Sequence, residues 1–308
     1  MTESAVDPTA PPQPRVRALS PSRASDFMNC PLLYRFRVVD RLPEAPSPAA
    51  TRGTVVHTVL ERLFDLPAPD RTLAAATALV GPAWEQALAD DPDLAALFAP
   101  DPEAAAQRAG DDGSAPADIA DWIGGAEDLL ASYFALEDPT RLEPAERELH
   151  VEAPLASGLV LRGYVDRLDQ APDGALRVVD YKTGRAPRDG FEQKALFQMR
   201  FYALALWRLR GEIPRRLQLL YLGSGETVTL DPDEADLLAM ERKLEALWTA
   251  IERAHDTGDW RPSPSRLCDW CDHQPLCPAW GGTPPPLPVH ADPAVSAADA
   301  AVVAEVDG

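Results

Sequence analysis

Alternation of apolar and polar residues dominates the second half of the chain and predicts strands there. Past residue 147, apolar positions recur with a period of two or in short runs, and each run is bounded by Gly, Pro or Asp. Such segments are typical of strands. They cover residues 148–155, 159–169, 175–184, 217–222 and 226–230. The first three follow one another closely, so we expect them to pair as an antiparallel meander.

Spacings of three and four between apolar residues predict helices in the other parts of the chain. One helix starts at about Ser20, where hydroxyl and carboxylate caps precede the first apolar residues. The others cover 54–64, 191–209 and, after the cap Asp231-Pro232, a last segment to Asp256. The order of helices, strands, helix, strands and helix predicts an α/β sandwich built on a small mixed sheet.

Composition divides the chain into one domain and two tails. The 308 residues are 45% hydrophobic and 25% charged, which fits one soluble core. Residues 1–17 are rich in Pro and polar, and residues 283–308 are rich in Pro and Ala. Both segments are predicted to be disordered, the second as an acidic tail. Within the domain, 18–282, we expect a helical insertion at 68–140 and a cysteine segment at 262–282. No apolar run is long enough for a membrane span or a signal peptide, so we expect a cytoplasmic protein with no membrane contact.

The net charge of −20 is concentrated in two places. Between Glu85 and Glu146, sixteen acidic residues stand against two arginines, and the tail after Thr283 carries four acids and no base. The remainder is nearly neutral, so it can hold a local basic groove although the whole chain repels phosphate. We expect the acidic region to lie away from the active face, or over it as a gate, and to be dispensable for chemistry.

Two acidic residues and a lysine come together if strands 159–169 and 175–184 form a hairpin. The turn between them centres the pairing near Asp173, so that opposed positions add up to about 346 and Asp166 faces Asp180. Opposed side chains share one face of the sheet, about 5 Å apart at Cβ. Lys182 lies two residues beyond Asp180 and projects from the same face.

Two like charges in this arrangement repel each other unless a positive charge lies between them. Carboxylate oxygens suit Mg²⁺ or Mn²⁺, which can polarise a phosphodiester and lower the pKa of a bound water, while Lys182 orients that water or neutralises charge on the phosphate. The alternative is that Asp166 and Asp180 are solvated strand residues paired with Lys182 or a neighbouring arginine, because short Asp-x-Lys patterns recur by chance. The two valines before Asp180 favour the metal site, since charges on a partly buried strand need a partner.

At these residues the chain resembles the RecB-like nucleases of the PD-(D/E)XK superfamily, which include CRISPR-associated RecB-like exonucleases and the nuclease domains of recombination helicases. The resemblance covers roughly Ser20 to Trp280, interrupted by the acidic region. It implies a restriction-endonuclease-like core with a small mixed sheet flanked by helices. It also implies that Asp166, Asp180 and Lys182 are catalytic, with the two aspartates binding the metal.

The same resemblance assigns roles to residues outside the hairpin. The family's Gln-x-x-x-Tyr motif matches Gln198 and Tyr202, which share one helix face and are expected to be catalytic. Its upstream metal-binding histidine matches His57, and Glu61, one turn later, is a weaker second candidate. By their neighbours alone, Tyr202 could equally be a core residue, and a lone histidine at position 57 would more often be one.

Four cysteines form a second candidate site. Cys268, Cys271 and Cys277 lie close together, and Cys30 precedes Cys268 by 238 residues. In a cytoplasmic protein this set favours a metal or a cluster over disulfides. Zinc normally takes two closely spaced pairs of ligands, whereas a 4Fe–4S cluster needs four thiolates and accepts a distant one. RecB-like exonucleases with an iron–sulfur cluster show the same split, so we favour 4Fe–4S; zinc, with His273 as a spare ligand, is the alternative.

These features predict an enzyme that cleaves DNA, from an end and on single strands, during repair or recombination. The chain has no Gly-x4-Gly-Lys-[Ser/Thr] loop and so no ATP motor of its own. A helicase or recombination protein is a candidate partner besides the DNA. The alternative is a non-catalytic iron–sulfur module that binds DNA or acts as a scaffold while a partner supplies the chemistry. Intact Asp166, Asp180, Lys182 and Gln198 favour the enzyme.

Overall fold

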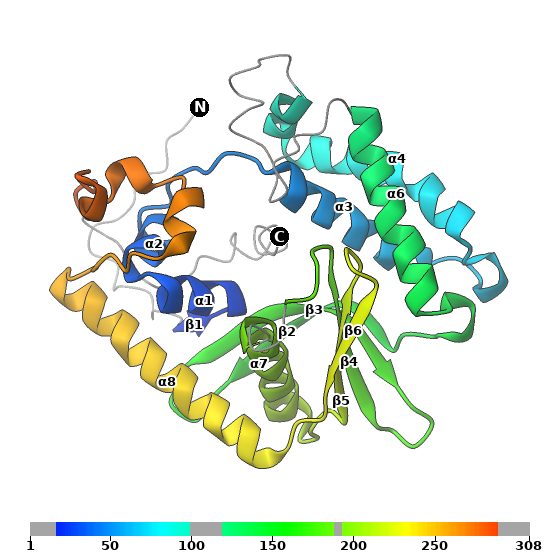
Figure 1. The fold of residues 1–308 in the computed structure, drawn as a ribbon. Coiled ribbons are helices and arrows are strands. Elements are labelled where there is room, and N and C mark those ends of the chain that lie inside the picture. The colour runs from blue at the N-terminus through cyan, green and yellow to red at the C-terminus, as the bar shows by residue number, and fades with distance from the viewer. Residues whose placement is uncertain (1–16, 99–118, 188–192, 289–308) are drawn as a thin grey trace, which may run out of the picture.

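The computed structural model describes residues 17–98, 119–187 and 193–288. Six strands in these ranges form one mixed sheet (Figure 1): β1 (Ala18–Leu19), β2 (Glu146–Pro154), β3 (Val160–Gln170), β4 (Leu176–Lys182), β5 (Arg216–Tyr221) and β6 (Glu226–Leu230). β3 pairs antiparallel with β2 along one edge. Its other edge pairs with β1 at one end and with β4 at the opposite end. β4 then pairs in parallel with β5, and β5 antiparallel with β6.

The strand predictions and the hairpin register are confirmed. Each of the five predicted strands is present, with its ends within two residues of the predicted ones. In the hairpin, Arg167 lies opposite Val179 and Gln170 opposite Leu176, so paired positions add up to 346. β1 was not predicted, because a strand of two residues has no period to recognise.

The helices pack on the sheet in two groups. The first comprises α1 (Pro21–Asn29), α2 (Pro31–Tyr34, continued as a π-helical turn over Arg35–Val39), α7 (Gln193–Arg210) and α8 (Glu234–Thr257). The second comprises α3 (Pro48–Leu63), α4 (Leu73–Asp90) and α6 (Ile119–Leu136). The first group encloses a hydrophobic core with residues of β2, β3, β4 and β5, and the second encloses another core with residues of β4 and β5 that alternate with those of the first. The predicted α/β architecture is therefore confirmed.

Two helix starts differ from the predicted ones. α3 begins at Pro48, six residues before the predicted start, because Ser47 caps it by accepting a hydrogen bond from the backbone N–H of Ala50. α8 is capped by Asp233 rather than by Asp231-Pro232; the Asp233 carboxylate accepts from the Asp236 N–H at 2.8 Å. Asp231 instead forms an ion pair with Arg216 on the first residue of β5. No helix in the described part of the chain has both the length and the apolarity needed to cross a bilayer.

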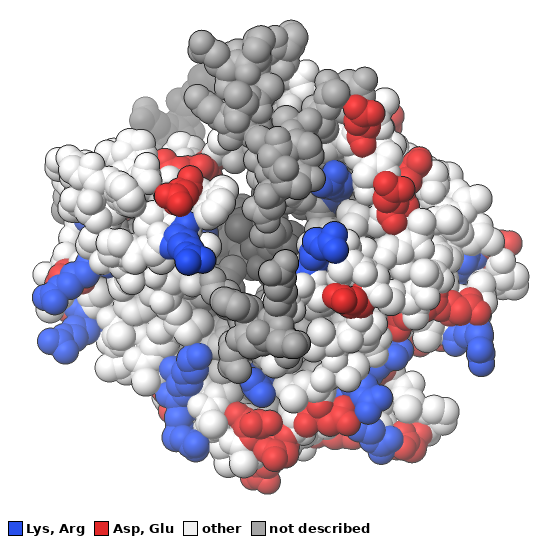
Figure 2. Space-filling model, in the orientation of Figure 1, with Lys and Arg blue, Asp and Glu red and all other residues white. Residues whose placement is uncertain are grey.

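The ends of the described chain are held by polar contacts. Arg17 forms an ion pair with Glu252 of α8, and Arg35 donates a hydrogen bond to the carbonyl of Pro285. Residues 1–16 and 289–308 of the predicted tails lie outside the described residues. On the face seen in Figure 2, basic and acidic side chains of the described residues are interspersed.

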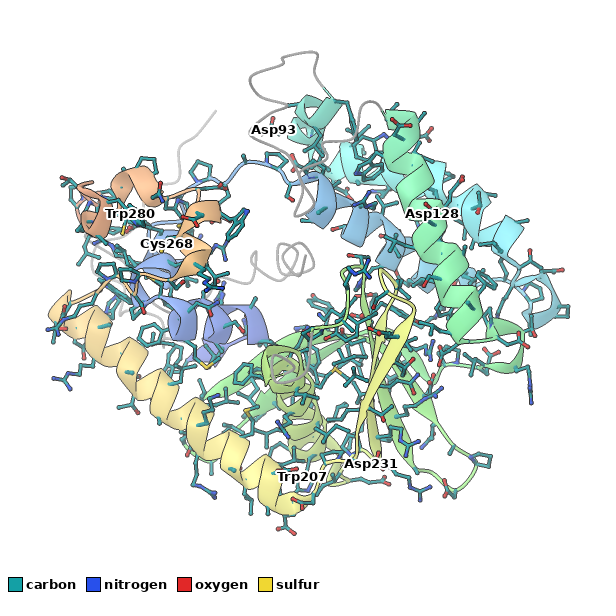
Figure 3. The ribbon with its side chains drawn as sticks, viewed as in Figure 1. Asp93, Asp128, Trp207, Asp231, Cys268 and Trp280 are labelled. Carbon is teal, nitrogen blue, oxygen red and sulfur yellow. The ribbon has the colours of Figure 1, made fainter. Side chains whose placement is uncertain are left out.

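The acidic region contributes buried side chains to the second core, so the structure does not support the expectation that it can be removed without effect. Trp122 of α6 is completely buried and donates its indole N–H to the carbonyl of Pro48 at 2.9 Å. Leu130 and Tyr133 of the same helix are also completely buried. Asp93 and Asp128 of this region are exposed, and Figure 3 shows Asp128 on the opposite side of the view from Cys268. These two carboxylates lie on the outer surface of the region, whereas its buried side chains pack against β4 and β5.

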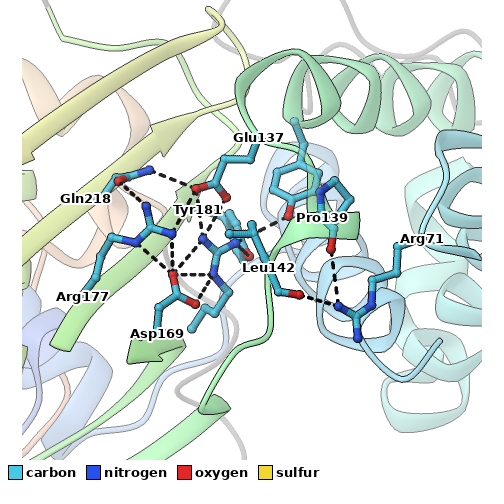
Figure 4. A network of polar contacts seen from close by, with 10 residues as sticks. Arg71, Glu137, Pro139, Leu142, Asp169, Arg177, Tyr181 and Gln218 are labelled. Carbon is cyan, nitrogen blue, oxygen red and sulfur yellow. Dashed lines mark hydrogen bonds and ion pairs between the residues drawn. The ribbon is translucent and has the colours of Figure 1, made fainter. Parts of the chain in front are cut away.

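A buried arginine ties the acidic region to the sheet (Figure 4). Arg167 of β3 is 0% exposed, forms ion pairs with Glu137 and Asp169, and donates to the hydroxyl of Tyr181 at 2.8 Å. Arg177 of β4 also forms ion pairs with Asp169 and Glu137. These partners offset the cost of burying the guanidinium, and removing one of them would leave an uncompensated charge.

Candidate active site

The hairpin opens where its two acidic residues lie. β3 and β4 pair only as far as Arg167 and Val179, whereas β4 continues through Lys182 in its pairing with β5. β1 joins the same edge of β3 only at residues 160 and 161. The edge of β3 from 162 to 166 therefore faces a gap between β1 and β4, which we call the notch. Asp166 and Asp180, opposite each other in the register, lie where the notch begins.

Asp166 is held by the backbone of the neighbouring strand. One carboxylate oxygen, Oδ2, accepts the N–H of Tyr181 at 2.7 Å, so the carboxylate takes the place of the next strand–strand hydrogen bond. The same oxygen lies 3.5 Å from Nδ1 of His57, on α3. Asp166 is thus fixed by a local contact that only the opening of the hairpin makes available.

His57 points into the same space. Its Nε2 lies 3.0 Å from the carbonyl oxygen of Tyr181, a geometry in which Nε2–H donates. In that tautomer Nδ1 carries the lone pair and faces Asp166, which is the usual arrangement of a metal-ligating histidine oriented by a backbone carbonyl. The imidazole ring also packs edge-on against Tyr181. The contact to Asp166 favours the ligand over the packed core residue.

A third carboxylate, which the sequence did not single out, completes the group. Glu148 of β2 lies between the pairs Arg147–Arg167 and Leu149–Val165, and so stands across from Asp166. One ligand atom each of His57, Glu148 and Asp166 lie within 4.8 Å of one another. Glu148 has a φ of 43°, a left-handed conformation that is rare for residues other than glycine and is concentrated at functional sites.

Glu148 is surrounded by other carboxylates. Burial, and after it the charges of three neighbouring carboxylates, raise the pKa of Glu148 to about 8. Asp166 and Asp180 are two of these neighbours, and Glu61 of α3 is the third. A divalent cation among these oxygens would remove the repulsion. The mixture of carboxylate oxygens and one imidazole suits Mg²⁺ or Mn²⁺, and Glu61 stands outside the group of three.

Asp180 is not a solvated strand residue. It is 2% exposed, and its Oδ2 lies 3.2 Å from Nζ of Lys182. Lys182 in turn donates to Oε1 of Gln198 at 2.8 Å. The ammonium is therefore held between strand β4 and helix α7, beside the carboxylates.

The Gln-x-x-x-Tyr pair supports the lysine from α7. The amide of Gln198 donates to the hydroxyl of Tyr202 at 3.4 Å, and Tyr202 is largely buried in the first core. Gly163 of β3 makes room for this tyrosine, because a Cβ atom there would lie 2.7 Å from Cε1 of Tyr202. The packing of Tyr202 therefore explains why a glycine occupies the position three residues before Asp166.

The four cysteines come together at another place, beside α1 and α2. All four line one cavity, although Cys30 is separated from the others by most of the chain. Backbone N–H groups of Ser263 and Ser265 donate to the sulfurs of Cys30 and Cys268, each at 3.3 Å. Burial raises the pKa of Cys271, and the charges of Cys268 and Cys30 add to this.

His273 has another partner. Its Nε2 lies 2.8 Å from Oε1 of Glu44, and its ring packs against Phe36. Burial alone would raise the pKa of Glu44, but hydrogen bonds from His273 and Arg37 hold it at about 2. This contact engages Nε2 of the histidine that the zinc alternative names as a spare ligand.

The structure therefore brings the predicted residues together in two groups. His57, Asp166, Asp180, Lys182, Gln198 and Tyr202 lie at the notch, and the cysteines lie at their own cavity. Glu148 could have been found by the same arithmetic as the hairpin, because β2 and β3 pair about the turn at 156–158 with positions adding up to 314.

Comparisons with known proteins agree with this geometry. The sequence model of the PD-(D/E)XK nuclease superfamily matches residues 18–278. The Gene 69 protein of Mycobacterium phage D29 is 26% identical over 275 residues, which make up 85% of this chain and 96% of that protein. A protein from Eubacterium rectale that is named as a candidate exonuclease has a similar structure, with a TM-score of 0.51 and 15% identity over 83% of this chain and 88% of that one. At that identity, the likeness concerns the fold alone.

Proposed function

This chain belongs to the PD-(D/E)XK nuclease superfamily, and from that membership we propose that it is a RecB-like, metal-dependent deoxyribonuclease that degrades DNA from an end, in repair or recombination. The observation that carries the proposal is the convergence of His57, Glu148 and Asp166 beside Asp180 and Lys182. A cluster of buried carboxylates, of which one keeps a proton unless a cation binds, fits a metal-dependent catalyst better than a non-catalytic module.

The residues of the notch divide the chemistry among them. The ion would be held by His57, Glu148, Asp166 and Asp180. When bound, it would polarise the phosphodiester and activate a water molecule. Lys182 stands next to Asp180 with its ammonium fixed by Gln198, so it can orient the attacking water and stabilise negative charge on the phosphate. Tyr202 limits the movement of Gln198, and through it of the lysine.

We further propose that Cys30, Cys268, Cys271 and Cys277 bind a 4Fe–4S cluster. All four line one cavity. Four thiolates around a zinc ion, each at about 2.3 Å, would lie about 3.8 Å apart. Among the described residues, no three of these sulfurs come within 4.8 Å of one another, which is wider than the spacing around a single zinc ion. N–H donors to two of the sulfurs would stabilise thiolates.

The cluster would act as a structural clasp. Cys30 directly follows α1, and the other three ligands follow α8, so the cluster joins the two ends of the domain. Hydrolysis of a phosphodiester transfers no electron, and the cysteines do not belong to the group around Asp166. Loss of the cluster should therefore lower the stability of the protein and should not act directly on the cleavage chemistry.

One preparation tests both proposals. Protein purified under strict anaerobiosis is mixed with end-labelled single- and double-stranded DNA in Mg²⁺, Mn²⁺ or EDTA, and its visible spectrum and iron and zinc contents are recorded. We expect metal-dependent cleavage from the ends, a brown protein and about four irons per chain. Cleavage in EDTA would overturn the metal mechanism, and a colourless protein with one zinc would overturn the iron–sulfur assignment.

A further inference from the structure

One face of β2 and β3 is open next to the notch. Along both strands, alternate side chains are buried in the first core, whereas those between them are exposed or half-exposed. The exposed or half-exposed ones are His150, Glu152 and Pro154 on β2, and Val160, Arg162 and Tyr164 on β3. We call this surface the open face. Such a face of a sheet is normally either covered by another element or exposed to solvent. Here the open face extends directly to the candidate metal ligands.

Two aromatic rings lie on the open face at its end beside the notch. His150 and Tyr164 are directly opposite in the register, and their rings are tilted by 44° with centroids 5.0 Å apart. The next positions along the same rows are Glu148 and Asp166. Two residues of a strand span about 7 Å, so the ring pair is a short step from the ligands.

Charge does not provide the affinity for a strand on this surface. Arg162, the basic residue of the open face, is paired with Glu152 across the two strands, at 3.1 Å. The chain as a whole carries a charge of −20, which repels phosphates. Stacking of bases on aromatic rings is an alternative source of affinity that needs no positive charge and tolerates any sequence.

We infer that Tyr164 and His150 form a stacking platform for an unpaired base next to the scissile phosphate, and that the enzyme therefore prefers single-stranded DNA. This inference rests on the proposed nuclease function. A duplex hides the faces of its bases within the stack, so only an unpaired base can lie on these rings. The platform holds the strand across β2 and β3, and the adjacent phosphate then reaches Glu148 and Asp166.

The test measures binding without cleavage. Fluorescence anisotropy of a labelled oligo(dT) strand and of a blunt duplex is followed in EDTA, with wild-type protein and with the variants Tyr164→Ala, His150→Ala and Tyr164→Phe. We expect Tyr164→Ala to weaken oligo(dT) binding by about 5- to 150-fold, the range found when a stacking ring is removed. Tyr164→Phe keeps the ring and should bind like the wild type. The loss should be similar at low and high salt, because stacking releases no counterions.

The outcomes separate this inference from the proposed function. Equal loss of oligo(dT) and duplex binding, or no loss of either, would overturn the platform. Weak binding by Tyr164→Phe as well would point to the hydroxyl and would also overturn it. Failure of the wild-type protein to cleave oligo(dT) in Mg²⁺ or Mn²⁺, measured separately, would instead overturn the nuclease. The thermal midpoint of each variant shows whether it is folded, and His150→Ala provides a second loss of a ring if Tyr164→Ala is not.

Discussion

Replacing Glu148 by glutamine removes one carboxylate from the notch and keeps the shape of the side chain. In the absence of a metal, the pKa of Glu148 is raised from 4.5 to about 8. The folded protein therefore keeps a proton that the unfolded chain releases above pH 4.5. The contribution of Glu148 to the free energy of unfolding is complete below pH 4.5 and is lost as the pH rises through 8.

The size of this loss follows from the two pKa values. One pH unit corresponds to about 1.4 kcal/mol, so the full difference amounts to about 5 kcal/mol. Glu148 is partly exposed, and solvent screens the repulsion, so we expect about 1–3 kcal/mol. Glutamine does not titrate. Glu148→Gln should therefore be more stable than the wild type at pH 8 by about this amount, in EDTA, and equally stable near pH 4.5.

Chemical denaturation with and without Mg²⁺ measures the free energy of unfolding of the wild type and of Glu148→Gln in both conditions. In Mg²⁺ the order should reverse, because the wild type gains the free energy of metal binding and the variant loses a ligand. Cleavage by the variant should fall at least about 100-fold, since even residues that only orient ligands cost up to that factor. Glu212→Gln, at an exposed position between α7 and β5 and away from the notch and the open face, is the control and should show neither effect. Equal stability of Glu148→Gln and wild type at pH 8, or undiminished cleavage, would refute the role of Glu148.

Three further changes test other parts of the molecule. His57→Ala should lower cleavage at least about 10-fold and shift the preference from Mn²⁺ toward Mg²⁺, because an imidazole ligand favours Mn²⁺; unchanged specific activity with a lower thermal midpoint would mean a packed core histidine. Cys30→Ser should lose the visible absorption of the cluster and lower the thermal midpoint; a variant with the wild-type spectrum would exclude Cys30 as a ligand. Deletion of residues 85–146 should leave no cooperative unfolding transition, because loss of Trp122 alone costs about 3–5 kcal/mol and Arg167 would lose Glu137; a folded deletion would contradict the second core.

The strands and the hairpin could be predicted because their information is local. Alternation fixes which side chains share a face, and the turn near Asp173 fixes the register that sets Asp166 against Asp180. The position of Lys182 then follows from the period of a strand. The resemblance to a known family supplied His57, Gln198 and Tyr202, whose contacts with the hairpin depend on helices far away in the sequence.

The rest depends on tertiary contacts that no local pattern records. The register of β2 places Glu148 across from Asp166, but its role depends on the opening of the hairpin and on its left-handed backbone. The acidic region was misjudged because net charge describes the outer surface of its helices and not the inner surface, where Trp122 is buried. The network of Arg167 joins strands and a helix that only the folded chain brings together.

Anomalous scattering from crystals soaked in Mn²⁺ tests the metal site directly. The account predicts one strong peak in the notch, with Nδ1 of His57 and carboxylate oxygens of Glu148, Asp166 and Asp180 as ligands, and the loss of that peak in crystals of Asp166→Asn. Manganese bound elsewhere in the wild-type crystals, with none in the notch, would contradict it.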